Sequence, residues 1–515
     1  MSREIIAILR GIETEEATAV TEALIAQVIV AKFGDHLPFY RQAEIYARQG
    51  IQLDRATLGN WAGRACFHLK PVASHMSWHL AGADRLFMDE TTAPVLDPAM
   101  PPQARPTWSK ARWIGLLDLD ECTPDADGAV EFVPRHAEGY GLARVLMRRG
   151  TEPLGFVEAS VRDGRVRLPA AAVPNDPDPA EIAPLAPMSV VVCTRDRPDQ
   201  LTDALTSILA SDYPDFEVVV VDNAARTGAT TAVVEKLSDS RLRLVAEPRP
   251  GLSRARNAGL RQARHQFVAF TDDDVVVDRQ WLRGIARGFG RSPRVSCVCG
   301  LIPSGELRTP AQAYFDQRVS WAGSLRPRLF SLAEPPEDLP LFPFQVGRIG
   351  AGANFAVRRD RIAALGGFDE ALGAGTAAQG GEDLDMFFRV VTAGDTLAAE
   401  PSAIVWHRHR SDNDALLRQV RGYGVGLGAW LTKVGSDRSN RQLAWRILRR
   451  RLGSSLRAGA DYGAIMAMPY SMPGFRDDLP GALGRTEVMA VLSGPTALWR
   501  GRRAITGATT AAAPR

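Results

Sequence analysis

Cysteine is scarce in this chain of 515 residues, which contains five: Cys66, Cys122, Cys193, Cys297 and Cys299. So small and odd a number argues against a framework of disulfide bonds and favours a reducing compartment. Two of the five alternate in the apolar run that begins at Val295, and this alternation predicts a strand. Two thiols by themselves are weak support for a metal site.

Long apolar runs are also missing. No segment approaches the ~20 uninterrupted apolar residues of a membrane-spanning helix. The chain begins MSREIIAILRGIETEEA, which mixes acidic with apolar side chains and lacks the basic start and apolar core of a secretory signal. These absences predict a cytoplasmic protein.

A large excess of either charge is absent as well. The formal net charge is +3, and the composition of 45% hydrophobic and 23% charged residues is that of a globular protein. The average charge therefore gives no support for a nucleic-acid partner, and none is expected. The length exceeds what one compact core accommodates, so several domains are expected.

Changes of composition divide the chain. Proline density rises around 97–106, and a second stretch at 174–187 has the Pro/Asp composition of an extended spacer. Apolar spacing predicts helices before the first break and short strands between the two. Strands that alternate with helices then predict a parallel α/β sheet. The expected parts are 1–104 (helical), 105–170 (small and β-rich), 171–187 (linker), 188–410 (α/β) and 411–515 (helical).

Polar residues follow three of the predicted strands of the α/β part, which are 189–193, 217–221, 242–245 and 267–270. Thr194 and Arg195 follow the first, Asp222 follows the second, and an Asp run, Asp272 to Asp274, follows the fourth. Ligands of open parallel sheets bind at the carboxyl ends of the strands, so a polar ligand is predicted there. Asp222 alone is more typical of a helix cap or a turn.

The Asp run is the strongest single signal. Three adjacent carboxylates repel one another, and a bound cation that shares its oxygen ligands with a phosphate relieves the repulsion. An isolated run of this kind is more often a solvated turn. Its position directly after an apolar strand favours the cation.

Three further motifs predict partners for the Asp run. The loop 247–259 brings Arg254, Arg256 and Asn257 towards the same edge, where arginine suits phosphate, although a solvated helix start fits equally well. A double glycine precedes the acids at 382–383, which head a predicted helix and are also typical caps. The strand at 403–406 leads to histidines at 407 and 409, either of which could complete a metal site; solvated histidines are the alternative.

Taken in order, these motifs resemble the family 2 glycosyltransferases, which have the GT-A fold, from about 187 to 433. The matching segments are 191–195, 220–223, 256–259, 272–274, 381–383 and 407–409. The resemblance implies an inverting glycosyltransferase that uses Mg²⁺ or Mn²⁺, a nucleotide-sugar donor and a glycan or lipid-linked acceptor, as in cell envelope polysaccharide synthesis. It implies these roles: Asp383 as catalytic base with Glu382 beside it; Thr194, Arg195, Asp222, Arg254, Asn257 and Asp273 near the nucleotide; Asp272, Asp274, His407 and His409 near the metal.

The segment from about 20 to 98 resembles an insertion-sequence transposase of the DDE class. The matching stretches are 31–42, 56–64 and 86–91 together with 95–98. In that family Asp89 would be the first catalytic carboxylate, with two more needed much later to hold paired metal ions. The pattern changes after Pro98, so the resemblance implies a truncated remnant ahead of the transferase. The stretch from 108 to 168 resembles a module sometimes found ahead of such transferases.

Two other classes stay open from the sequence. One is a DNA-binding, transposase-derived protein, and the other is a nucleotidyltransferase, which also uses Asp motifs at strand ends. The basic tail around Trp445, Leu448 and 449–451 is typical of a helix on an anionic membrane surface, at the inner face of the cell membrane. It is equally typical of a solvated helix packed on its own domain.

Overall fold

The computed structural model describes residues 28–29, 31, 39–48, 53, 57–58, 61–62, 105–122, 124–169, 185–319, 322–458 and 483–511. Contacts divide the chain into two compact units, Met1–Pro94 and Val95–Arg515. The first unit contains α3 (Phe39–Arg48) and a small buried cluster of Val28, Tyr46 and Leu58. Asp89, Cys66 and most of the expected linker lie outside the described residues.

A small β-rich module opens the second unit. Its five-stranded sheet has the order β1-β3-β4-β5-β2, in which β1 pairs with β3 in parallel and the other pairs are antiparallel. Alternate residues of β3 (Ala143, Val145 and Met147) are buried in its core. The strands are β1 (Arg112–Asp118), β2 (Val130–Phe132), β3 (Leu142–Arg149), β4 (Glu152–Arg162) and β5 (Arg165–Leu168).

The larger sheet has nine strands, with a path of order β10-β14-β11-β13-β9-β6-β7-β8 and β12 paired to β14. Its strands are β6 (Met188–Thr194), β7 (Phe216–Asn223), β8 (Leu242–Glu247), β9 (Phe267–Thr271), β10 (Val275–Val277), β11 (Val295–Leu301), β12 (Arg328–Phe330), β13 (Asn354–Arg358) and β14 (Thr396–His407). The four strands predicted from the sequence, which are β6, β7, β8 and β9, run parallel to one another as expected. The antiparallel pairs of β13, β10 and β12 depart from the purely parallel sheet that the rhythm predicted.

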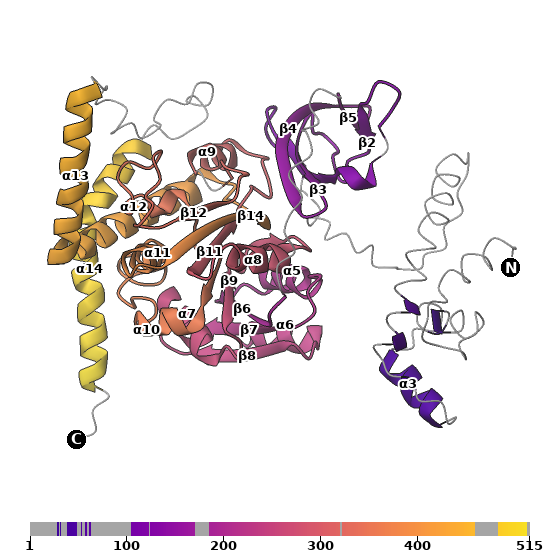
Figure 1. Ribbon diagram of the computed structural model, residues 1–515, viewed down its shortest axis with the longest axis horizontal. Helices are drawn as coiled ribbons and strands as arrows, with labels where there is room; N and C mark the ends of the chain where they lie inside the picture. The colour runs from indigo at the N-terminus through magenta and orange to yellow at the C-terminus, as the bar shows by residue number, and fades with distance from the viewer. Residues whose placement is uncertain are drawn as a thin grey trace, which may run out of the picture. The chain divides into compact units, whose positions relative to one another are not determined.

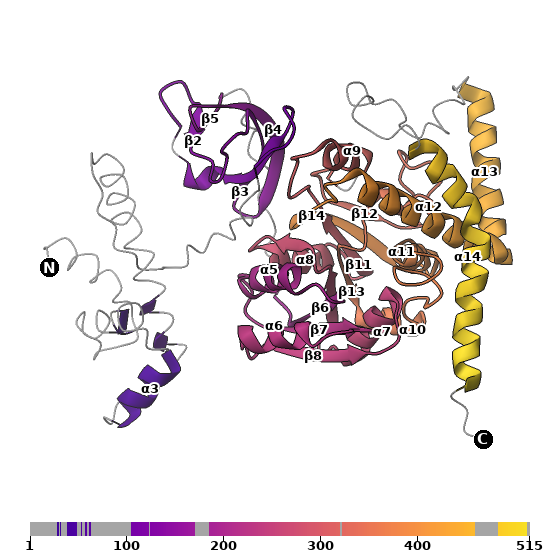
Figure 2. The same ribbon diagram turned by 180° about the vertical axis from the view of Figure 1, so that it is seen from behind.

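Helices cover both faces of this sheet (Figures 1 and 2). Valines alternate between the layers: Val190 and Val192 pack with α5 and α8, whereas Val191 packs with α7 and α11 on the other face. The helices are α5 (Pro198–Leu209), α6 (Ala229–Leu237), α7 (Leu252–Gln262), α8 (Trp281–Gly290), α9 (Pro310–Arg318), α10 (Arg359–Ala364), α11 (Glu382–Thr392), α12 (Asn413–Ser436), α13 (Arg438–Ala458) and α14 (Leu483–Ala511). This confirms the predicted α/β architecture, the β-rich module ahead of it and the helical tail after it. The strand predicted at Val295 is β11, and Cys297 and Cys299 lie in its apolar core.

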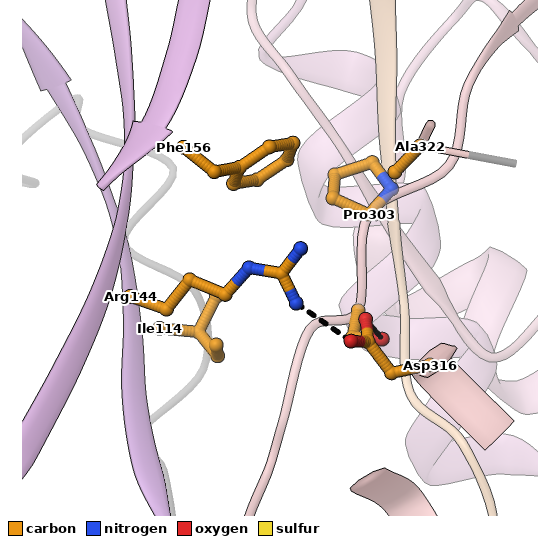
Figure 3. A pocket seen from close by; sticks show the side chains of 7 residues that line it. Ile114, Arg144, Phe156, Pro303, Asp316 and Ala322 are labelled. Carbon is orange, nitrogen blue, oxygen red and sulfur yellow. Dashed lines mark hydrogen bonds and ion pairs between the residues drawn. The ribbon is translucent and has the colours of Figure 1, made fainter. Parts of the chain in front are cut away.

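The β-rich module contacts the larger sheet within the second unit. Arg144 Nη1 donates to Asp316 Oδ2 at 2.6 Å, and Arg148 Nη1 donates to Asp278 Oδ2 at 2.8 Å. Beside the first pair, Ile114, Phe156, Pro303 and Ala322 help to line a small pocket (Figure 3). Ile114 also shares a buried apolar cluster with side chains of β10, β11 and β14. The module therefore covers the outer side of these strands.

Glycines let the tail helices approach the α/β domain closely. On α12, Gly424 and Gly428 contact α14, where a Cβ on Gly428 would lie 2.0 Å from the carbonyl oxygen of Val491. Gly426 contacts the loop before α11, and its Cβ would lie 2.6 Å from the carbonyl carbon of Gly380. The helix thus packs its backbone against two elements at once. In the described part of the chain, no helix has the length and apolarity needed to cross a membrane.

Replacement of Gly428 by alanine should lower the thermal unfolding midpoint. The new Cβ would force α12 and α14 apart, and overpacking of this kind costs roughly 1–3 kcal/mol. Gly435→Ala in the same helix is the matched control, because a Cβ there meets nothing within 4 Å. That variant should gain up to about 1 kcal/mol of helix propensity. Equal midpoints for the two variants, measured by circular dichroism, would show that this close packing is not required.

Candidate active site

The carboxyl ends of β6, β7 and β9 lie together because these strands are parallel neighbours. Thr194 ends β6 and pairs in register with Asp222 of β7. Asp272 follows Thr271, the last residue of β9, which pairs with Val192 of β6. The structure therefore brings together the three polar turns that the sequence predicted at one edge.

His407 reaches this edge through an antiparallel strand pair. β10 follows the Asp run directly, and its first residue, Val275, pairs with His407 at the end of β14. His407 Nε2 thereby lies 3.4 Å from Asp274 Oδ1. The ligand atoms of Asp272, Asp274 and His407 all lie within 4.8 Å of one another. Two carboxylates and an imidazole are ligands that a divalent cation such as Mn²⁺ accepts, so these residues fit a metal site.

Asp272 and Asp274 have opposite electrostatic surroundings. Burial raises the pKa of Asp272 to about 6, and the charge of Arg256 only partly opposes this rise. Asp274 is half-buried, which by itself would raise its pKa, but His407 and Arg410 hold the pKa of this carboxyl well below its usual range. A divalent cation beside both groups would favour the ionised form of Asp272 as well.

Asp273 bonds to the loop that follows β6. Its carboxylate accepts hydrogen bonds from Thr194 Oγ1 at 2.7 Å and from Arg197 Nη1 at 3.0 Å. Both Thr194 and Asp273 are buried. The two residues, each predicted near the nucleotide, thus bind each other and tie the end of β6 to the end of β9.

Arg256 connects the Asp run to the start of α11. Its side chain is 3% exposed, and Nη1 donates to Glu382 Oε1 at 2.9 Å. Nη2 lies 3.5 Å from Asp272 Oδ1 and donates to the carbonyl oxygen of Gly352 at 2.9 Å. One buried cation therefore contacts an acid of the metal group and an acid of the predicted catalytic pair.

Asp383 is oriented by backbone donors. The backbone N–H of Gly352 donates to Asp383 Oδ2 at 2.9 Å, and that of Leu384 donates to Oδ1 at 2.8 Å. Each carboxylate oxygen keeps acceptor capacity beyond these bonds. Because the carbonyl oxygen of Gly352 also accepts from Arg256, the backbone of Gly352 links the arginine to Asp383.

Glu382 is the buried member of the pair. Burial, followed in importance by the neighbouring carboxylate of Asp383, raises the pKa of Glu382 to about 7, against the pull of Arg256. The preceding residue, Gly381, has φ +84, and a Cβ there would lie 2.6 Å from the carbonyl oxygen of Gly426. Only glycine fits this position, which explains the second glycine of the motif.

Asp222 lies across the edge from these groups. It is half-buried and accepts a hydrogen bond from Thr230 Oγ1 at 3.0 Å. Burial raises the pKa of Asp222, and the charge of Asp196 adds to the effect. Asp196 in turn accepts from the backbone N–H of Arg226 at 3.1 Å, which joins the loops after β6 and β7. Arg195 is exposed on the first of these loops.

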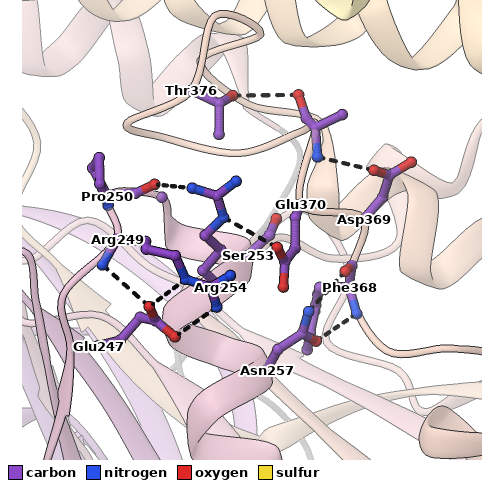
Figure 4. A network of polar contacts seen from close by, with 12 residues as sticks. Glu247, Arg249, Pro250, Ser253, Arg254, Asn257, Phe368, Asp369, Glu370 and Thr376 are labelled. Atoms are coloured by element: carbon purple, nitrogen blue, oxygen red, sulfur yellow. Dashed lines mark hydrogen bonds and ion pairs between the residues drawn. The ribbon is translucent and has the colours of Figure 1, made fainter. Parts of the chain in front are cut away.

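The structure does not bring Arg254 and Asn257 to the Asp run (Figure 4). Arg254 Nε donates to Glu370 Oε2 at 3.1 Å. Asn257 holds the backbone of Phe368, with Nδ2 donating to its oxygen at 2.9 Å and Oδ1 accepting from its N–H at 2.8 Å. Both side chains therefore fasten α7 to the segment before α11. Their predicted contacts with a nucleotide stay predictions.

His409 contacts the other histidine rather than the acids. Its Nδ1 lies 3.2 Å from His407 Nδ1, and its ring packs on Phe315 with centroids 4.5 Å apart. Burial, and then the proximity of His407, lowers the pKa of His409, so the neutral ring is favoured. In the described residues the metal group includes His407 and not His409.

Three arginines at this edge had no predicted role: Arg256, which was expected only to reach the edge, and Arg197 and Arg410. Arg254 and Arg256 are two positions apart, which is about 200° around a helix, so only one of them can face the acids. The spacing shows that only one of the two arginines can face the acids, but it does not show which one. Arg197 and Arg410 lie just beyond the matching segments 191–195 and 407–409, and only the folded chain places their guanidinium groups beside Asp274.

Two family patterns match the chain. The family described as Glycosyl transferase family 2 matches residues 189–360, and the family described as Transposase IS66 family matches residues 17–119. Both resemblances predicted from the motifs are thereby confirmed. The first match contains the Asp run and Arg256, whereas Asp383 and His407 lie beyond its end. The second extends into β1 of the β-rich module.

The chain matches different fractions of the length of its relatives. An uncharacterized protein, y4jD of Sinorhizobium fredii, is 49% identical over 78 residues, which are 15% of this chain and 15% of that protein. The succinoglycan biosynthesis protein ExoM of Rhizobium meliloti is 31% identical over 253 residues, which are 48% of this chain and 71% of that protein. The solved mannosyltransferase PcManGT of Pyrobaculum calidifontis, in complex with GDP-Man and Mn²⁺, is 21% identical with a TM-score of 0.41, over 62% of this chain and 90% of that one.

The stability of the metal-free protein should fall between pH 4.5 and about 7 because of Glu382. Its pKa is raised from 4.5 to about 7 in the folded chain, so its contribution is fully present below pH 4.5 and is lost as the pH rises through 7. The loss is on the order of 3 kcal/mol. Glu382→Gln should flatten this part of the pH dependence of urea unfolding in EDTA. The exposed control Glu334→Gln should keep the slope, and a wild-type slope in Glu382→Gln would exclude Glu382 as its source.

Proposed function

The chain belongs to glycosyl transferase family 2, and from this premise we propose that it is an inverting, metal-dependent glycosyltransferase. It moves a sugar from a nucleotide-sugar donor to a hydroxyl of a glycan or lipid-linked glycan. The observation that carries the proposal is the metal group of Asp272, Asp274 and His407, joined through buried Arg256 to the start of α11. Donor and acceptor chemistry need these two sets of residues side by side.

The metal group and the nearby arginines supply the donor side of the reaction. A divalent cation held by Asp272, Asp274 and His407, with Mg²⁺ or Mn²⁺ as candidates, would offset the charge that builds on the departing nucleoside diphosphate. Arg197 and Arg410 lie at the same edge and could contact its phosphate oxygens. Asp222, at the end of β7, accepts a hydrogen bond from the base or ribose.

Asp383 supplies the acceptor side. In a single displacement, it removes the proton of the acceptor hydroxyl while that oxygen attacks the anomeric carbon and the bond to the diphosphate breaks. The two backbone N–H groups that hold its oxygens fix the direction of the carboxylate. Asp383 lies in the first turn of α11. Glu382 binds Arg256 and so positions the loop of Gly352 rather than reacting itself.

The acceptor class and the location of the protein are the remaining parts of the proposal. The similarity to a succinoglycan biosynthesis protein favours an acceptor in envelope polysaccharide synthesis. A lipid-linked acceptor would place the protein at the inner face of the cell membrane. The nucleotidyltransferase alternative differs in its product, because it releases pyrophosphate from a nucleoside triphosphate instead of a nucleoside diphosphate from a nucleotide sugar.

Asp383→Asn should keep nucleotide-sugar binding and lose transfer. The amide cannot accept the hydroxyl proton, and removal of a general base costs roughly 10²–10⁴-fold in rate. Nucleoside diphosphate release from a panel of UDP- and GDP-sugars measures the rate, and calorimetry measures donor binding. The matched control is Asp199→Asn, an exposed acid in the first turn of α5, which should keep wild-type turnover. Near-normal release by Asp383→Asn would sink the assignment of the base.

Removal of the metal should abolish transfer, and Asp274→Asn should weaken Mn²⁺ binding by more than roughly tenfold, the loss caused by removing even an outer-shell partner of a metal ligand. Calorimetry with Mn²⁺ alone gives the affinity, and activity in EDTA gives the requirement. Asp163→Asn, in a turn of the β-rich module with φ +49, is a control that asparagine tolerates. Full activity in EDTA would contradict the proposed role of the metal group.

A further inference from the structure

Large apolar side chains are exposed mainly on the tail helices. Of the eleven that are exposed in the described part of the chain, six lie on α13 and α14, so the exposure is concentrated rather than scattered. On α14 they are Val488, Met489, Leu492 and Trp499, with exposed fractions of 53–68%. An apolar patch of this kind on a folded domain marks an interaction surface.

These four residues form a stripe along one side of α14. Val488, Leu492 and Trp499 recur at the helical spacing of four and seven residues, so their side chains lie in line. The opposite side of the helix is buried: Ala490, Gly494, Ala497 and Leu498 pack against the domain. The stripe is therefore not the part of α14 that holds it in place.

The exposed charged side chains of α14 itself are all of one sign. Arg485, Arg500, Arg502 and Arg503 are all exposed, and the guanidinium of Arg503 lies 4.3 Å from the centre of the Trp499 ring. The one acid in the sequence of α14, Glu487, is buried and paired with Arg318. The exposed side of α14 thus combines tryptophan, aliphatic side chains and arginine with no carboxylate.

A second helix repeats this chemistry. The sequence of α13 contains no acid, and its exposed Trp445 and Leu448 lie one turn apart, with the exposed Arg441 and Arg449 one turn from them. Aliphatic and indole side chains flanked by arginine are typical of helices that lie in the interface of an anionic bilayer. The exposed charged side chains of α13 and α14 are all cations, which suits the phosphates of an anionic bilayer.

We propose that the exposed side of α14, the stripe of Val488, Met489, Leu492 and Trp499 with its arginines, docks on the surface of an anionic lipid bilayer. The arginines bind lipid phosphates, and the apolar side chains enter the boundary between headgroups and acyl chains. The sequence predicted membrane contact only for the basic segment around Trp445, which lies on α13. The proposal extends membrane contact to the exposed side of α14. Its consequence for a lipid-linked acceptor rests on the proposed function.

The packing of α14 makes this docking relevant to the active site. Gly494 of α14 lies against Gly428 of α12, and Gly426, half a turn away on α12, lies against Gly380 and Gly381. Gly381 is the residue before Glu382 and Asp383. Backbone contacts therefore connect the docking helix to the start of α11 through a single intervening helix, so a docked α14 fixes the direction in which the catalytic edge faces.

Vesicle binding of the full chain tests the proposal without donor or acceptor. The wild-type protein should co-sediment with vesicles made of phosphatidylglycerol and phosphatidylcholine, and it should bind vesicles of phosphatidylcholine alone more weakly. Added salt should dissociate the protein from the anionic vesicles. The double variant Leu492→Ser/Trp499→Ser should bind the anionic vesicles at least roughly tenfold more weakly, since it removes two large apolar side chains from the interface. Arg500→Gln/Arg503→Gln should lose mainly the preference for anionic lipid.

Matched controls separate this surface from a general effect. Val133→Ser/Leu329→Ser removes two exposed apolar side chains elsewhere, and Arg162→Gln/Arg279→Gln removes two exposed arginines elsewhere; both should bind vesicles like wild type. Wild type that ignores anionic vesicles, or α14 variants that bind them normally, would overturn the proposal. The proposal would also be overturned, in favour of self-association, if the wild-type protein formed a dimer and did not bind vesicles, and if Leu492→Ser/Trp499→Ser converted that dimer to a monomer in analytical ultracentrifugation.

The same variants keep the two proposals distinguishable. Nucleoside diphosphate release from nucleotide sugars in solution should be unchanged in the α14 variants, because none of their residues lies at the catalytic edge. Loss of vesicle binding with intact release would support the docking surface. Vesicle binding by a wild type that releases no nucleoside diphosphate would contradict the proposed function alone.

Discussion

The candidate active site depends on one buried guanidinium. Arg256 is almost completely shielded from water, where an unpaired charge would be strongly destabilising. It is neutralised by Glu382 and Asp272, and the carbonyl oxygen of Gly352 satisfies a further donor. Because the two acids come from segments more than a hundred residues apart, this one charge holds the end of β9 and the start of α11 in a fixed relation.

The register between β10 and β14 holds His407 in a fixed position relative to the Asp run. His407 meets Asp274 because β10 begins immediately after the Asp run and pairs with the last residues of β14. A shift of one residue in that pairing would turn His407 to the other face of the sheet. The β-rich module packs on the outer side of the same strands, so its apolar cluster with Val276 and Trp406 helps to keep this register.

The tail helices show how a close approach can serve two purposes. The glycines of α12 let one helix contact both the loop before α11 and α14 without an intervening layer of side chains. Small residues at such contacts leave α14 free to expose its large apolar side chains outward. In α14, small residues lie on the buried side and large apolar residues lie on the exposed side. This arrangement is expected of a helix whose exposed side binds a partner.

The sequence by itself determined the α/β class, the four parallel strands and the polar turns after them, because alternating valines and residues that follow a strand are local features. It also determined the family, since six motifs occur in order. Only the tertiary structure decided that Arg256 rather than Arg254 faces the acids, that Asn257 and Asp273 bond within the fold, and that His407 rather than His409 joins the metal group. Those choices depend on helix rotation and on antiparallel register between distant strands, and neither is encoded in the spacing of a single segment.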